Sequence, residues 1–97
     1  MEKTIQFILS QKLEKKRKQI DAIDHQLLIL LNRRLRLALE VGNIKDKVGK
    51  KIYDSPREKK VLERLRVKNK GPMTEDQLKK IFGAIMKVCR GSQTLNI

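Results

Sequence analysis

Apolar residues in the first half of the chain recur at intervals of three and four from about Ser10 to Val48. This spacing places them on one face of an α-helix, and no proline interrupts the stretch. The pattern therefore predicts a single helix of about 38 residues, about 57 Å long. Gly49 then supplies a natural stop, and Gly42 either weakens the helix or allows a backbone or a ligand to approach closely. The apolar face consists of Leu13, Ile20, Ile23, Leu27, Leu31, Ala38, Val41 and Val48.

A second, shorter helix is predicted after a helix-start sequence. Ser55 is the expected N-cap, Pro56 takes the first helical position, and Glu58 three residues after the serine completes a capping box. The helix should begin at Pro56 and run to about Lys68, with an apolar face of Val61, Leu62 and Leu65.

A third helix is predicted after the break at residues 69–72. Thr74 with Gln77 forms a second capping box, and the apolar pattern continues to about Gly91. No strand pattern, internal repeat or low-complexity tract competes with this interpretation. The predicted fold class is all-α, with one long and two short helices in each chain.

The unequal helix lengths predict self-association. Two helices of about 13 and 17 residues cannot cover both halves of one of about 38 without leaving apolar surface bare. A two-fold dimer with antiparallel long helices would bury the overhang of each chain against the short helices of the other. We therefore expect an intertwined antiparallel homodimer.

Arg34 and Lys45 interrupt the apolar face of the long helix. Eleven residues separate them, which leaves them about 20° apart in azimuth and about 16 Å apart along the axis. Because unpaired buried charge is costly, an anionic group is expected to meet them, or the face is not a dry core. In an antiparallel dimer Arg17 of one chain would approach both, although Arg17 and Arg34 of a single helix are about 25 Å apart.

The charge balance changes this picture little. The 97 residues include 24 Lys+Arg and 11 Asp+Glu, for a formal net charge of +13, which would suit nucleic acid. Aromatic residues for base stacking are nearly absent, however, and the lysines are scattered. We expect solvated helix faces that steer small anions, without nucleic-acid binding. The aromatic residues are Phe7, Tyr53 and Phe82.

A single cysteine excludes a disulfide framework within the chain and fits a reducing compartment. The start, MEKTIQFILS, has no small-residue cleavage site, and no long apolar run suggests a membrane span. The expected location is the cytoplasm, without membrane association.

Motifs for covalent, nucleotide or metal chemistry are missing from the sequence, so no cofactor and no metal are expected. His25 has no serine or cysteine partner at an interpretable spacing, and we interpret it as an exposed helix residue. The remaining polar set suits a small polyanion, or a reaction whose transition state needs charge placed around it. This set comprises the cations Arg17, Arg34, Lys45 and Arg57, with Asp54, Glu58 and Gln93 as polar complements.

In order and spacing, these residues resemble the all-helical family of chorismate mutases, from Leu13 to Gln93. Each element alone is a weak signal, whereas the whole series is specific. The series reads Arg17-xx-Ile20-Asp21-xx-Asp24-xx-Leu27-Leu28-xx-Leu31-xx-Arg34, Val41-Gly42-xx-Lys45, Ile52-Tyr53-Asp54-xx-Arg57-Glu58, Gly71-Pro72, Ile81-Phe82 and Gln93.

The resemblance implies a dimer of three-helix chains with intertwined long helices. It also implies the Claisen rearrangement of chorismate to prephenate, without a cofactor, metal or covalent intermediate. Arg34 and, from the other subunit, Arg17 would hold the two substrate carboxylates by bidentate contacts. Lys45 and Gln93 would hydrogen-bond the ether oxygen, which gains negative charge as its bond to carbon breaks.

The same resemblance implies that Glu58 and the backbone around Asp54 bind the ring hydroxyl, with Arg57 assisting. Cys89 stands where many relatives carry a small hydroxyl residue near the substrate carboxylate, so the chain departs from the family at this substrate-binding position. Residues 11–93 would form the chorismate mutase-like helical domain, after an N-terminal extension of residues 1–10 and before a C-terminal tail of residues 94–97.

Structural interpretations of the same residues stay open at this point. Asp24 of a partner helix could neutralise Arg34. Lys45 lies near the C-terminal end of the helix, where a cation interacts favourably with the helix macrodipole. Glu58 completes the predicted capping box with or without a substrate. Gln93 could lie on a frayed end.

Three functional alternatives also stay open. The first is a lyase of the same fold that releases pyruvate from isochorismate. The second is a basic helical dimer that binds nucleic acid, which only the net charge supports. The third is a mutase that depends on another enzyme of the shikimate pathway.

Overall fold

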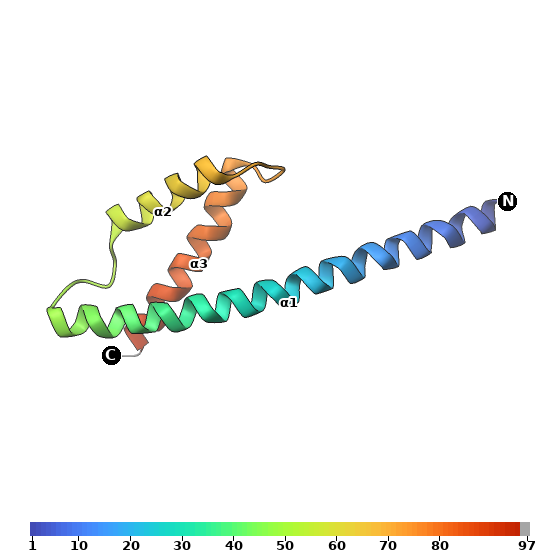
Figure 1. The fold of residues 1–97 in the computed structure, drawn as a ribbon. Helices are drawn as coiled ribbons and strands as arrows, with labels where there is room; N and C mark the ends of the chain where they lie inside the picture. Colours follow the sequence, from blue (N-terminus) through green and yellow to red (C-terminus); the bar gives the residue numbers. More distant parts are fainter. Residues whose placement is uncertain (96–97) are drawn as a thin grey trace. The chain divides into compact units, whose positions relative to one another are not determined.

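The computed structural model describes residues 1–95, which form three α-helices and no strand, as the all-α prediction requires (Figure 1). They are α1 (Glu2–Val48), α2 (Ser55–Lys68) and α3 (Glu75–Leu95). The first two residues of the expected C-terminal tail thus belong to α3, and residues 96 and 97 lie outside the described part. The chain divides into two compact units, one from Met1 to Arg34 and one that begins at Leu35. None of the described helices is long and apolar enough to cross a membrane.

Helix α1 begins earlier than the sequence pattern predicted. It starts at Glu2 instead of about Ser10 and contains 47 residues. The apolar spacing continues through Ile5, Ile8 and Leu9. Glu2 in the first turn interacts favourably with the helix dipole and so stabilises this start. The expected N-terminal extension is therefore helical.

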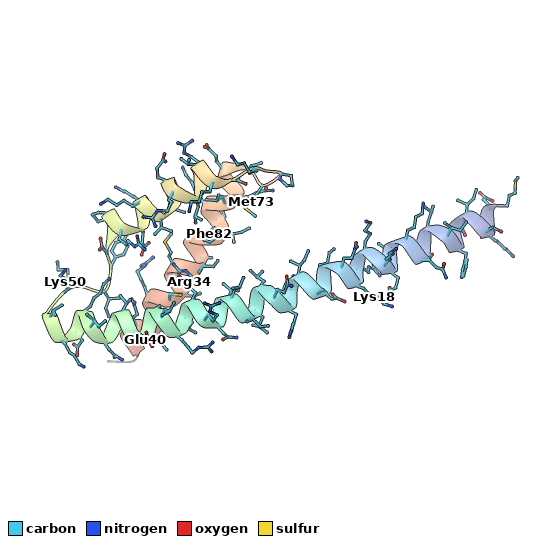
Figure 2. All side chains as sticks on the ribbon, viewed as in Figure 1. Lys18, Arg34, Glu40, Lys50, Met73 and Phe82 are labelled. Atoms are coloured by element: carbon cyan, nitrogen blue, oxygen red, sulfur yellow. The ribbon has the colours of Figure 1, made fainter. Side chains whose placement is uncertain are left out.

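The first unit is one helix, and its side chains, among them Lys18, project away from the helix axis (Figure 2). Ile20, Ile23 and Leu27 of the apolar face are 48–60% exposed. His25 is also exposed, as predicted. A lone helix with such a face owes little of its stability to tertiary packing.

The second unit contains the end of α1, and Gly49 stops the helix as predicted. Its φ of 71° lies in the left-handed region, which glycine adopts without steric cost. The amide of Gly49 donates to the Asp46 carbonyl at 3.3 Å, and the amide of Lys50 donates to the Lys45 carbonyl at 2.8 Å. These two bonds form a Schellman motif, which fixes the direction in which the chain leaves α1.

Helix α2 is capped one residue earlier than predicted. Asp54 is the N-cap, and its Oδ1 accepts a hydrogen bond from the Arg57 amide at 3.0 Å. The predicted capping box of Ser55 and Glu58 is therefore wrong, because aspartate caps as well as serine and precedes it in the chain. Glu58 takes the fourth helical position, from which its side chain does not reach back to the cap.

Helix α3 starts as predicted and packs against α2 (Figure 1). Thr74 Oγ1 accepts from the Gln77 amide at 3.1 Å, and Gln77 Oε1 accepts from the Thr74 amide at 3.0 Å. Met73 lies in the connecting loop and Phe82 on α3 (Figure 2). The most buried apolar side chains all come from α3: Leu78, Met86 and Cys89.

Candidate active site

Lys45 occupies the last turn of α1 and is half-buried. Its Nζ donates to the main-chain carbonyl of Ile52, in the loop before α2, at 2.8 Å. This bond ties the ammonium group to the loop and limits its rotamers. Since an ammonium group carries three protons, two more donors remain for a ligand.

Gln93 lies near the end of α3 and is only 7% exposed. Its Nε2 donates to the Ala38 carbonyl of α1 at 2.7 Å, so the residue is fixed and not frayed. A Cβ placed on Gly42 would lie 3.0 Å from Gln93 Cγ, so a close approach does occur at this glycine, but a side chain makes it instead of the expected backbone or ligand. The amide nitrogen carries two protons, so one donor remains beyond the bond to Ala38.

Glu58, in the first turn of α2, pairs with Arg90 of α3 across the two helices. Arg90 Nε lies 2.6 Å from Glu58 Oε2. The Arg90 guanidinium carbon also stands 4.5 Å from the centroid of the Tyr53 ring, within the range of a cation–π interaction. Sequence reasoning missed Arg90, although it precedes Gln93 by three residues and therefore shares its face of α3.

These contacts connect Lys45, Glu58 and Gln93 around one place in the second unit. Gln93 touches α1 three residues before Lys45, and Lys45 binds the residue next to Tyr53. Arg90, which contacts Tyr53 and Glu58, is one turn before Gln93. The circuit therefore passes through α1, the loop, α2 and α3. Its members are Ala38, Gly42, Lys45, Ile52, Tyr53, Glu58, Arg90 and Gln93.

Three predicted residues of the second unit stand differently. The Asp54 side chain is engaged in capping α2. Arg57 is exposed, and its main-chain amide serves the same cap. Cys89 is buried at 8% exposure as part of the apolar interior. Their expected contacts with a substrate stay predictions.

Arg17 and Arg34 belong to the first unit, where Arg17 is exposed and Arg34 is half-buried. Both lie on α1, as predicted. A contact between Arg17 and the other residues was expected only across a dimer, and it stays a prediction.

The second unit presents hydrogen-bond donors of Lys45 and Gln93, and the chain of contacts described above links them to a carboxylate paired with an arginine. Such an arrangement can bind oxygen atoms of an anionic molecule and stabilise negative charge that develops on one of them. Within residues 1–95, no three His, Cys, Asp or Glu side chains group as ligands for a metal ion. The fold and site define a three-helix protein with a preorganised polar centre that is rich in donors.

Comparison with known proteins gives this class a family. The sequence pattern described as chorismate mutase type II matches residues 16–94. The chain belongs to the type II chorismate mutase family, which confirms the resemblance inferred from its motifs.

Solved structures agree in both fold and sequence. The chain is similar to a chorismate mutase (form II) from Thermus thermophilus, with 30% identity and a TM-score of 0.84 over 86% of this chain and 94% of that one. It is also similar to a chorismate mutase from Helicobacter pylori in complex with prephenate, with 32% identity and a TM-score of 0.81 over 87% and 91% of the two chains.

One longer relative is a bifunctional chorismate mutase/prephenate dehydratase from Aquifex aeolicus. It is 35% identical over 83 residues, which cover 81% of this chain. The chain spans 23% of the length of that relative.

Proposed function

We propose that this chain catalyses the rearrangement of chorismate to prephenate. The observation that carries the proposal is the pair of donors, Lys45 on α1 and Gln93 on α3, each of which a hydrogen bond to a main-chain carbonyl holds in place. The structure of the similar Helicobacter pylori enzyme in complex with prephenate supports the choice of ligand. A Claisen rearrangement needs no nucleophile, which agrees with a site built from donors and charges.

Lys45 and Gln93 are proposed to bind the ether oxygen of chorismate. This oxygen gains negative charge as its bond to carbon breaks, and each residue keeps at least one spare proton to donate. Because protein contacts already orient both groups, little reorganisation is needed when the charge develops. Catalysis would combine this stabilisation with restriction of the substrate to a folded, chair-like conformation.

Arg34 of one subunit, together with Arg17 of the partner subunit, is proposed to hold the two substrate carboxylates. A guanidinium group binds a carboxylate through two parallel hydrogen bonds, which fixes orientation as well as charge. The proposal requires an intertwined antiparallel homodimer. Its support is the apolar face of α1 in the first unit, where Ile20, Ile23 and Leu27 are all exposed.

Glu58 is proposed to accept a hydrogen bond from the ring hydroxyl. The main chain around Asp54 and the side chain of Arg57 would complete this side of the site. Cys89 is buried, so we propose that its side chain packs near the substrate carboxylate without binding it. A main-chain group would then take the place of the hydroxyl that many relatives carry at this position.

A buried thiol also fits a reducing compartment, and we propose that the protein works in the cytoplasm. Localisation of the chain fused to a fluorescent protein in its host cells tests this. Enrichment outside the cytoplasm would contradict it.

The decisive experiment mixes purified protein with chorismate and follows loss of substrate and appearance of prephenate by chromatography. A parallel reaction with isochorismate tests the lyase alternative, in which pyruvate is the product. Prephenate formation well above the uncatalysed rate supports the proposal. No acceleration at concentrations where a dimer is demonstrated would rule it out, and salt-sensitive retention on DNA would then favour nucleic-acid binding.

A further inference from the structure

Arg90 holds Glu58 from the opposite helix. The separation between Arg90 Nε and Glu58 Oε2 is 2.6 Å, which is short for a contact between opposite charges. On its other side the guanidinium lies over the Tyr53 ring. These two contacts, with a carboxylate and with an aromatic ring, restrict the Arg90 side chain.

The pair of Arg90 and Glu58 is more buried than the ion pair on the surface of α2. The side chains of Arg90 and Glu58 are 32% and 20% exposed, whereas those of Arg66 and Glu63 are 45% and 63% exposed. Screening by water weakens an exposed pair strongly and a half-buried one less. Arg90 can therefore restrict the Glu58 side chain, which otherwise has several accessible rotamers.

We propose that Arg90 is a positioning residue that orients Glu58 toward the ring hydroxyl of the substrate, an inference that rests on the proposed mutase function. The contact with Arg90 engages one carboxylate oxygen, Oε2. The other oxygen, Oε1, is then the atom that accepts the hydroxyl proton. Tyr53 supports this arrangement by keeping the guanidinium in its plane of contact.

The kinetic effect of this role follows from the chemistry of the hydroxyl group. It does not react, so its hydrogen bond to Glu58 has similar strength in the ground state and in the transition state. Loss of such uniform binding raises KM and changes kcat little. A loss of Lys45 or Gln93, by contrast, should lower kcat.

The test measures chorismate turnover for Arg90→Met, Glu58→Gln and the double variant, each at a concentration where the dimer is intact. We expect Arg90→Met to raise KM about tenfold and to change kcat less than about threefold, because a misaligned Glu58 loses its hydrogen bond to the ring hydroxyl, and hydrogen bonds to charged groups contribute strongly to binding. In the Glu58→Gln background the same substitution should change KM less than about twofold, since the two residues act as one unit. Lys87→Met removes a charge from the exposed face of the same helix and should leave both constants unchanged.

Two further variants guard against a purely structural effect. Arg90→Lys keeps the charge and should give a KM between those of the wild type and Arg90→Met. If Arg90→Met fails to fold, Arg90→Lys replaces it in the double-mutant cycle with Glu58→Gln. Tyr53→Phe keeps the ring and should match the wild type, whereas Tyr53→Leu should raise KM.

The outcomes separate the two proposals. Turnover by the wild type with unchanged KM in Arg90→Met overturns the positioning role and leaves the mutase function intact. An effect of full size in the Glu58→Gln background also overturns it, because Arg90 would then act on the substrate itself. Absence of turnover by the wild type overturns the mutase function.

Discussion

Gln93 packs against Gly42 so closely that a methyl group on the glycine would lie 3.0 Å from Gln93 Cγ and 3.1 Å from its Cβ. Few real Cβ atoms approach their neighbours this closely, so one of the two residues would have to move. The same side chain binds the Ala38 carbonyl of α1 at 2.7 Å. A glycine inside a long helix thus creates the space in which a proposed catalytic amide is held.

We predict that Gly42→Ala lowers kcat by roughly tenfold or more, because a displaced Gln93 amide loses its alignment with the ether oxygen. Stability should change little, since the gain in helix propensity of about 1 kcal/mol offsets the crowding. Steady-state kinetics and urea unfolding provide the measurements. Gly83→Ala is the matched control, because nothing lies within 4 Å of a Cβ at that position. Wild-type kcat in Gly42→Ala would contradict the role of this packing.

Lys45→Ala should depress turnover far more than folding. Loss of a donor to a developing oxyanion costs about 3 to 4 kcal/mol, or roughly 10²- to 10³-fold in kcat. Loss of the bond to Ile52 should lower the free energy of unfolding by only about 1 kcal/mol. Lys47→Ala, on an exposed position of the same helix turn, is the control. A fall in stability that accounts for the lost activity would instead assign Lys45 a structural role.

The shared site predicts complementation between two inactive chains. Arg17→Ala and Arg34→Ala should each abolish most turnover. After mixing and refolding, about a quarter of the wild-type sites should return, because half of the random dimers are mixed and each contains one intact site. Recovered activity is measured beside subunit exchange, which mass spectrometry of differently labelled chains reports. Exchange without recovery would contradict the contribution of Arg17 across the dimer.

The cap of α2 predicts opposite results for two adjacent residues. Asp54→Ala should lower the free energy of unfolding by about 1 kcal/mol, because the Arg57 amide loses its acceptor. Ser55→Ala should stay within about 0.5 kcal/mol of the wild type. Urea unfolding followed by circular dichroism checks both values. Asp54→Asn keeps an acceptor, so lost turnover in that stable variant would show a further role in substrate binding.

The surface pair of α2 predicts a change in titration. Hydrogen bonding to Arg66, with a smaller contribution from its charge, lowers the pKa of Glu63 below its ordinary value. A depressed carboxyl pKa stabilises the fold above the unfolded value, and this contribution is lost as pH falls through the folded value. Arg66→Gln should therefore raise the pKa of Glu63, as carbon NMR titration can measure. Lys80→Gln breaks the pair with Asp76 and should leave Glu63 unchanged.

Sequence reasoning predicted the three helices because periodicity and caps are local properties. The end of α1 at Gly49 and the capping box of Thr74 and Gln77 depend on residues within five positions, and both are confirmed. The start of α2 was wrong by one residue, because Asp54 and Ser55 are both good caps and the sequence does not rank them. The start of α1 was also wrong, because Ile5, Ile8 and Leu9 continue the apolar spacing and no proline separates residues 2–9 from the rest.

The partner of Glu58 was beyond sequence reasoning for a different reason. The pair joins residues 58 and 90 on different helices, and its geometry depends on how α2 packs against α3. A search for cations on the same face as Gln93 would have found Arg90, but not its partner. The residues resembling the family, by contrast, were found because their order and spacing are specific.

In the dimer that we propose, the exposed apolar face of α1 makes protein concentration a variable of catalysis. An isolated helix gains little stability from tertiary packing, so the order of residues 1–34 would follow the association equilibrium. Arg17 reaches the site only through that association. Dissociation of the dimer on dilution would therefore remove Arg17 from the substrate-binding site while the second unit is still folded. Chorismate would in turn favour assembly, because it binds only the complete site.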